Sequence, residues 1–219
     1  MVSAGADYLL NDKALIGLSM HYDRMSDPTD ANAEINGNGW LLGPYASFEI
    51  GTGVFWDSSL LYGGSSNDID TQFWDGDFDT RRWLIDTAIS GVWDLDAVTR
   101  LTPKLRAVYL SEKVMDYAVE NASQDAIDIE GFTAEQLRVS IGAEIARAFA
   151  LESGLVLTPT LGLTAGFSGL DGSGAFGSVS AGLTLQSQES WSVNSGLLLN
   201  VDGEGETSLG GKIGVSGQF

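Results

Sequence analysis

The chain has 219 residues, no cysteine, and 30 acidic against 11 basic side chains, which gives a formal net charge of −19 at pH 7. Because clustered Lys and Arg side chains are needed to neutralise phosphates, this charge excludes a nucleic-acid-binding protein. The lack of cysteine excludes disulfides, thiolate metal sites and cysteine nucleophiles. No run approaches the roughly 18 consecutive apolar residues of a transmembrane helix, so any membrane-spanning segment must be a strand.

The predicted elements are strands with one apolar and one polar side, eleven in all, each of the about 9 to 11 residues that a tilted membrane strand needs. In the second, Ala14–Asp23, the even-numbered residues are Ala, Ile, Leu, Met and Tyr, and the odd-numbered ones are Leu, Gly, Ser, His and Asp. The seventh, Gln136–Ile145, and the eighth, Leu155–Thr164, alternate similarly. The last, Thr207–Phe219, ends on an aromatic carboxyl terminus. Any one such strand would equally fit a soluble sandwich.

The lengths of the connections favour a barrel. The short predicted connections are Asn11–Lys13, Gly51–Gly53, Leu95–Val98, Ala148–Ser153 and Ser187–Ser190. The longer, acidic ones are Arg24–Asn38, Gly64–Asp79, Ser111–Phe132, Gly169–Gly174 and Asp202–Glu206. Short periplasmic turns that alternate with longer extracellular loops are typical of an outer-membrane barrel. We therefore predict an all-β, antiparallel, up-and-down transmembrane β-barrel that occupies residues 1–219 as one domain.

The strand count predicts a twelve-stranded barrel truncated at its start. Bacterial single-chain barrels have an even number of strands, and the last one runs toward the periplasm. Counting back from Phe219, the first visible strand also runs toward the periplasm, so one more strand is expected before Met1. Residues 1 to 15 also lack the basic segment and apolar core of a signal peptide, as expected of a fragment of an exported protein.

Aromatic residues support a bilayer, because Trp and Tyr favour the two membrane–water interfaces. Those near predicted strand ends, mostly on the apolar side, are Trp40, Trp56, Tyr62, Trp83, Trp93, Tyr109 and Trp191. Core aromatics of a soluble fold are the alternative. Pro44 falls inside a predicted strand, which has no explanation at this stage, because a central strand cannot use a residue without an N–H.

Charged residues on the polar side are expected to line the lumen of the barrel. They are Asp7, His21, Glu49, Asp57, Arg82, Asp86, Lys104, Arg106, Arg138, Glu144 and Lys212. Opposite charges among them could pair across the lumen and grip a plug helix. Solvation by lumenal water is the alternative, in which each pair contributes little. A charged residue on the lipid face would cost about 2 to 4 kcal/mol near the midplane of the bilayer. The position of these charged residues on the polar side therefore favours a membrane barrel, whether or not they pair with one another.

The succession of several segments resembles the autotransporter β-domain, the translocator barrel of type V secretion. These segments are AGADYLL (Ala4–Leu10), ALIGLSMHYDR (Ala14–Arg24), LLGPYASF (Leu41–Phe48), LLYGGSSNDIDT (Leu60–Thr71), LTPKLRAVYLSEKVMDY (Leu101–Tyr117), LTPTLGLTAGF (Leu157–Phe167) and the terminal Phe219. The resemblance covers nearly the whole chain. The family's first strand, the pore-spanning helix before it and the passenger are missing from this sequence.

The resemblance implies a barrel in the bacterial outer membrane that serves as exit and anchor for a covalently linked N-terminal passenger. The implied partners are outer-membrane lipid, the barrel assembly machinery and the passenger. The closing strand of such proteins is similar to the signal read by the assembly machinery, and the matching positions are Ile213, Val215 and Phe219. No catalytic residue, cofactor or metal is part of this prediction.

Two other functions stay open at this stage. One is a passive or adhesive outer-membrane barrel without a passenger. The other is a barrel enzyme that uses His21, the only histidine, beside Asp23 as an acid–base pair. No G-x-S-x-G or HExxH motif occurs. The acidic segment Asp68–Asp79 could bind calcium, but it lacks the EF-hand spacing, so a solvated surface loop is expected.

Overall fold

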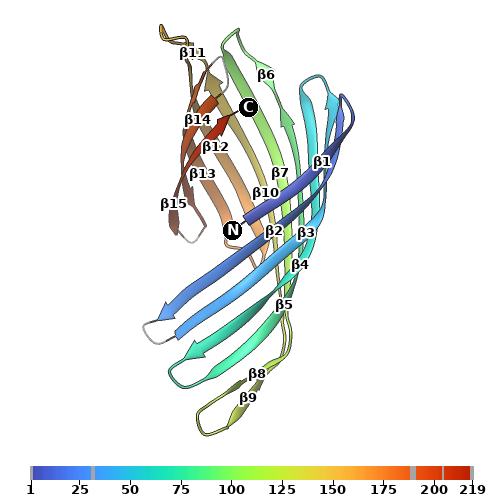
Figure 1. Ribbon diagram of the computed structural model, residues 1–219, viewed down its shortest axis with the longest axis vertical. Coiled ribbons are helices and arrows are strands. Elements are labelled where there is room, and N and C mark those ends of the chain that lie inside the picture. The colour runs from blue at the N-terminus through green and yellow to red at the C-terminus, as the bar shows by residue number, and fades with distance from the viewer. Residues whose placement is uncertain (1, 31–32, 188–190, 204, 218–219) are drawn as a thin grey trace. The chain divides into compact units, whose positions relative to one another are not determined.

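The structure is a computed structural model that describes residues 2–30, 33–187, 191–203 and 205–217 (Figure 1). The described residues form fifteen β-strands and the turns between them. The strands are β1 (Val2–Asn11), β2 (Ala14–Asp30), β3 (Ala33–Gly51), β4 (Val54–Thr71), β5 (Asp75–Gly91), β6 (Trp93–Asp94), β7 (Thr99–Val114), β8 (Tyr117–Glu120), β9 (Ala126–Ile129), β10 (Thr133–Arg147), β11 (Phe149–Ala150), β12 (Val156–Leu170), β13 (Gly174–Gln186), β14 (Trp191–Val201) and β15 (Thr207–Gly217). Within these ranges no helix is long and apolar enough to cross a membrane.

Eleven of the strands are hydrogen-bonded neighbours in chain order. Their order is β1-β2-β3-β4-β5-β7-β10-β12-β13-β14-β15. The four remaining short strands, β6, β8, β9 and β11, pair beside this path. Because each of these eleven strands pairs with the next of the eleven along the chain, the sheet is an antiparallel meander. The predictions of an all-β, up-and-down fold and of eleven strands are confirmed.

The chain divides into two compact units, which we describe separately. The first comprises Met1–Phe48, Asp57–Thr87 and Val108–Leu137. In it, β1 pairs with β2 so that Val2 lies opposite Tyr22, and β2 pairs with β3 so that Ala14 lies opposite Phe48.

The second unit comprises Glu49–Trp56, Ala88–Ala107 and Arg138–Phe219. Its strands β12 to β15 pair in regular antiparallel registers. Val156 lies opposite Gln186 in the first of these pairs. Trp191 lies opposite Gly217 in the last.

Hydrophobic side chains lie predominantly on the exposed surface of the described residues, so the usual relation of core and surface is inverted. Four are buried, namely Leu61, Ala88, Val114 and Val119, whereas 45 large ones are exposed. In β2, the exposed positions Ile16, Leu18, Met20 and Tyr22 alternate with half-buried polar or small residues. We call the side with the exposed hydrophobic residues the apolar face of each strand, and the opposite side its polar face.

Four of the five predicted short connections are confirmed, and the fifth, Ser187–Ser190, lies largely outside the described residues. Of the predicted longer loops, Gly169–Gly174 and Asp202–Glu206 are confirmed as the connections between β12 and β13 and between β14 and β15, whereas the other three are wrong. The turns at residues 12–13, 52–53, 95–98 and 151–155 fall within the predicted short connections or within two residues of them. The three acidic segments that were expected to be loops but are mostly strand are Arg24–Asn38, Gly64–Asp79 and Ser111–Phe132. Thus β4 continues to Thr71 and β5 begins at Asp75, and β8 and β9 form a further hairpin within Ser111–Phe132. Strand β8 also pairs with β5, Asp75 opposite Glu120, so hydrogen bonds between hairpins extend the sheet into these polar sequences.

Pro44 lies in the middle of β3, beside a point where two strands approach unusually closely. A side chain at the neighbouring residue, Gly43, would collide with the carbonyl oxygen of Leu60. The β2–β3 register runs without a break through this point, with Pro44 opposite Leu18, so the structure gives no irregularity of that ladder that would explain the proline.

Candidate functional site

The polar face carries the candidate functional residues. Strand alternation places all eleven charged residues singled out from the sequence on this face, on β1, β2, β3, β4, β5, β7, β10 and β15. We describe first those whose contacts are defined, within one unit at a time.

Asp7, Gly17 and Tyr45 form one row across β1, β2 and β3. Asp7 lies opposite Gly17, which lies opposite Tyr45. The Tyr45 ring lies over Gly17, where any side chain would collide with it, and its hydroxyl donates a hydrogen bond of 2.9 Å to Asp7 Oδ2. The glycine thus allows an aromatic side chain to cross one strand and reach a carboxylate on the next.

Phe176, Gly166 and Arg138 repeat this arrangement in the second unit. Gly166 of β12 lies opposite Phe176 of β13, and a side chain at Gly166 would collide with the Phe176 ring. The ring reaches Arg138 of β10, whose guanidinium carbon lies 4.1 Å from the ring centroid. This distance is typical of a cation–π contact.

Arg82 is the centre of a polar network in the first unit. Its Nε donates to Glu112 Oε1 at 2.7 Å and its Nη2 to Ser65 Oγ at 3.2 Å. Ser65 Oγ also shares a hydrogen bond of 2.8 Å with Thr80 Oγ1 and accepts one of 2.9 Å from Asn67 Nδ2. Ser65, Asn67 and Thr80 are only 7%, 4% and 5% exposed, so the network is largely shielded from solvent.

The sequence identified Arg82 but not its partners. A second cross-strand approach lies nearby, because Asp23 Oδ1 and Arg82 Nη1 lie 2.8 and 3.0 Å from the position that a Cβ at Gly39 would occupy. A glycine opposite a charged residue on a neighbouring strand is the sequence signal for such contacts, but it requires the register to be known.

Asp57 and His21, which were also predicted to line the lumen, each make a side-chain hydrogen bond to a serine. Asp57 Oδ1 accepts a hydrogen bond of 2.6 Å from Ser47 Oγ. Nδ1 of His21 shares one of 2.9 Å with Ser3 Oγ. For Glu49, Asp86, Lys104 and Arg106 the position on the polar face is defined by strand alternation.

Glu144 and Lys212 line a shallow groove of about 730 Å³ on the polar face of the second unit. Its floor consists of small residues, among them Gly182, Gly196 and Gly210. Lys212 lies opposite Gly196, and its Cε is 3.1 Å from where a Cβ of that glycine would be. The groove is therefore shallow, and the side chain of Lys212 lies along its floor.

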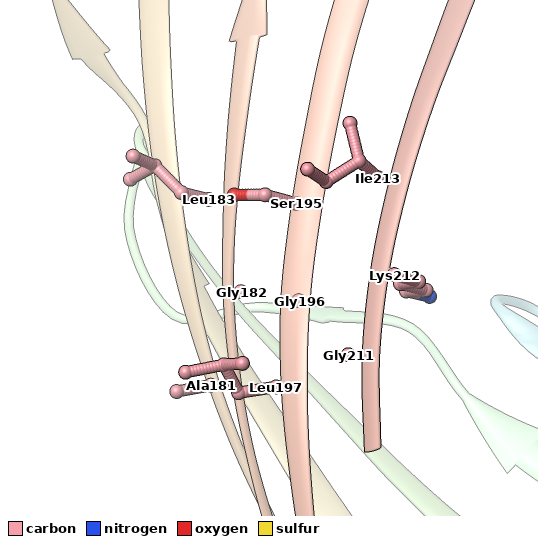
Figure 2. Close-up of a pocket in the computed structure, with 9 residues that line it drawn as sticks. All are labelled: Ala181, Gly182, Leu183, Ser195, Gly196, Leu197, Gly211, Lys212 and Ile213. Carbon is pink, nitrogen blue, oxygen red and sulfur yellow. The ribbon is translucent and has the colours of Figure 1, made fainter.

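The predicted assembly residues lie on the apolar face of β15. Ile213 and Val215 are 83% and 75% exposed. Figure 2 shows Ile213 in a row with Ser195 of β14 and Leu183 of β13, its register partners across the sheet. Phe219, the third predicted residue, lies outside the described residues.

An aromatic row crosses the apolar face of the first unit. Trp40 and Tyr62 make an edge-to-face contact with ring centroids 6.2 Å apart, and Tyr62 and Trp83 lie 4.6 Å apart. Tyr22 lies opposite Trp40 in register and donates a hydrogen bond of 3.0 Å to Asn38 Oδ1. The prediction that these aromatics lie near strand ends is wrong for Trp40, Tyr62 and Trp83, because the strands continue beyond them.

The turn between β6 and β7 is held by Asp96. Asp96 Oδ1 accepts hydrogen bonds of 2.8 Å from the backbone N–H groups of Val98 and Thr99. The Val98 N–H, followed by the Thr99 side chain, holds the pKa of Asp96 below its ordinary value. Arg147 Nη1, 4.0 Å from Asp96 Oδ2, acts in the same direction.

His21 is hydrogen-bonded to Ser3 through Nδ1 and not to Asp23, the residue that the sequence suggested as its acid–base partner. Among the described residues no carboxylate is hydrogen-bonded to the His21 ring, and Asp23 lies over Gly39 instead. Over the same ranges, no three His, Cys, Asp or Glu side chains gather in a way that could hold a metal ion.

Comparison with known proteins identifies one family. Residues 1–167 match the family described as the Autotransporter beta-domain. The search of curated proteins gives no match.

Solved structures of similar fold come from three autotransporters. The translocator domain of NalP from Neisseria meningitidis is 13% identical, with a TM-score of 0.73, and the match covers 99% of this chain and 79% of that one. The β-domain of the Bordetella autotransporter Brka is 11% identical (TM-score 0.69; 99% and 89% covered). The transport unit of AIDA-I from Escherichia coli is 14% identical (TM-score 0.63; 99% and 81% covered). At these identities the likeness shows the fold.

Proposed function

Since the chain belongs to the autotransporter β-domain family, we propose that its polar face lines a water-filled lumen and that its apolar face contacts outer-membrane lipid. The family membership makes the chain an outer-membrane translocator barrel of type V secretion, which exports a passenger. The proposal concerns which of its residues meet water and which meet hydrocarbon. It also takes residues 1–219 as one barrel domain.

The observation that carries the proposal is the inverted burial. Exposed Leu161, Leu163 and Phe167 alternate along β12 with Gly162, Thr164 and Gly166, which are less accessible. In water, so many exposed hydrophobic side chains would drive aggregation. In a bilayer they would face hydrocarbon, and the backbone groups between them are satisfied by strand pairing.

The polar face suits the passage of an unfolded passenger. The floor of the groove is formed by small residues, among them Gly182, Gly196 and Gly210, and the charged residues of the two rows are held by neighbours on the same wall. Because Tyr45 binds Asp7 and Phe176 binds Arg138, these charges lie along the wall. We infer that this keeps the lumen free for the passenger.

We further propose that β15 is the segment read by the barrel assembly machinery. Ile213 and Val215 are among the most exposed hydrophobic side chains of the described residues. Together with Phe219 they would give a partner protein an apolar recognition surface. The role of the whole chain is transport and anchoring, without catalysis by His21.

Paired single-cysteine variants test the orientation of the strands, and the native chain contains no cysteine to interfere. Leu163→Cys and Thr164→Cys change adjacent residues of β12 on opposite faces. After reconstitution of the full chain in phosphatidylcholine vesicles, a membrane-impermeant thiol reagent is expected to label Thr164→Cys much faster than Leu163→Cys.

The two labelling rates distinguish a membrane barrel from a water-soluble fold, because the exposure of the two side chains in water predicts the opposite order of rates. Leu163 is 59% exposed and Thr164 is half-buried, so in a water-soluble fold the cysteine at position 163 would react faster. Equal rates, or faster labelling at position 163 in vesicles, would refute the proposed orientation. Unfolded protein in urea, in which both cysteines react alike, provides the reference rate.

A further inference from the structure

Three basic side chains on the apolar face lie just beyond the aromatic row, on the side of the acidic hairpins. Arg24 follows Tyr22 by two residues on β2, and Arg81 precedes Trp83 by two residues on β5. Lys113 lies near the end of β7. All three are exposed. Because alternate residues share a face of a strand, Arg24 and Arg81 lie on the same face as the aromatic rings.

Arg81 and Lys113 lie opposite each other on adjacent strands. Their chain neighbours, Arg82 and Glu112, meet on the polar face with 2.7 Å between Nε and Oε1. Beyond this pair, the backbone N–H of Met115 donates to the carbonyl oxygen of Asp79 at 3.0 Å. Because successive side chains alternate, Arg81 and Lys113 are neighbours on the apolar face.

Like charges directly opposite each other destabilise a sheet unless an anion lies between them. In the part of the chain that the structure describes, neither Arg81 nor Lys113 has a salt-bridge partner. Two acidic groups on the same face have hydrogen-bond partners of their own. Asp79 Oδ1 accepts a hydrogen bond of 2.6 Å from Ser66 Oγ, and Glu135 accepts one from the Tyr109 hydroxyl. The two cations are therefore available to an anion from outside the chain.

We propose that Arg81 and Lys113, with Arg24 on the same face three strands from Arg81, bind the phosphate groups of phosphorylated lipids in the outer leaflet. Rings of Trp and Tyr lie at the level of the lipid headgroups, so side chains one step beyond them are at the height of the phosphates. Basic side chains at that height attract anionic headgroups even on a chain whose net charge is −19. The inference rests on the proposed lipid contact of the apolar face.

The test uses the full chain folded in a zwitterionic detergent and titrated with fluorescent lipid A. The variant Arg81→Gln/Lys113→Gln is expected to bind about thirtyfold more weakly, the combined effect of two basic groups at a membrane surface. The matched control Lys13→Gln/Arg100→Gln removes the same charge at the turn end of the strands and should bind as the parent does. Arg81→Lys/Lys113→Arg keeps both charges and should retain binding.

Dephosphorylated lipid A should bind the parent as weakly as lipid A binds the glutamine variant. The inference is overturned if the glutamine variant binds lipid A as the parent does, if removal of the phosphates has no effect, or if inorganic phosphate displaces the lipid at equal concentration. Failure of the parent to insert into plain phosphatidylcholine vesicles would instead refute the lipid contact of the apolar face. The two failures are therefore distinguishable.

Discussion

Replacement of Ile141 by arginine is the most direct energetic test of the proposed environment. Ile141 is 67% exposed on the apolar face of β10, six residues before Arg147 and eight after Thr133. At about 3.3 Å per residue and a tilt of about 40°, six residues correspond to about 15 Å of depth. This is half of a hydrocarbon core of about 30 Å, so Ile141 should lie close to the midplane.

The expected cost follows from that depth. An arginine on the lipid face costs about 2–4 kcal/mol at the midplane, and Ile141→Arg should lower the free energy of unfolding by this amount. The neighbouring change Ser140→Arg places the same side chain on the polar face. In water-filled surroundings an exposed substitution costs within about 0.5 kcal/mol. The predicted difference between the two variants is therefore about 2–4 kcal/mol.

The assay is urea-induced unfolding of the full chain from phosphatidylcholine vesicles, followed by the fluorescence of its six tryptophans. Loss of the heat-modifiable band on a gel gives an independent reading of the folded fraction. Equal free energies for the two variants would refute the reasoning, and so would a larger loss for Ser140→Arg. In either case the exposed side of β10 would not be in contact with hydrocarbon.

Three other perturbations have defined outcomes. Gly17→Val should lower the free energy of unfolding by about 1–3 kcal/mol because its side chain collides with the Tyr45 ring, and a loss of the same size in a Tyr45→Ala background would contradict this cause. The lowered pKa of Asp96 contributes stability above its ordinary pKa of 3.8, which is lost as the pH falls through the folded value; Asp96→Asn should flatten the acid side of the stability curve, and an unchanged curve would be inconsistent with the turn described. Deletion of Phe219 should reduce outer-membrane insertion far more than expression, and an unchanged amount of heat-modifiable barrel would reject its role in assembly.

The regular alternation of residues was sufficient to predict the long strands and their two faces. In Ala14–Asp23 and Gln136–Ile145 one side is apolar and the other polar or small, so the period of two identified both the strand and its two faces. Glycine-containing turns such as Gly51–Gly53 then separated the strands. The same alternation placed Asp7, Arg138 and other charged residues on the polar face.

The extended hairpins could not be predicted because they lack this alternation. Around Thr71 and Asp75 both sides of the strands are polar, and Ser, Asn and Asp have low strand propensity. Pairing with β8 supplies the backbone hydrogen bonds that propensity does not. The contacts of Arg82 with Glu112 were missed for a related reason: residues 30 positions apart become neighbours only through the register, which the sequence does not display.

The chain-order pairing of the strands affects how the sheet can form. Every hydrogen-bonded neighbour along the path from β1 to β15 is also the preceding or following long strand of the chain. The segments to be closed are short, and the entropy lost on closure grows only slowly with their length. Contact order within the meander is therefore low, and the sheet can grow by successive addition of hairpins at one edge.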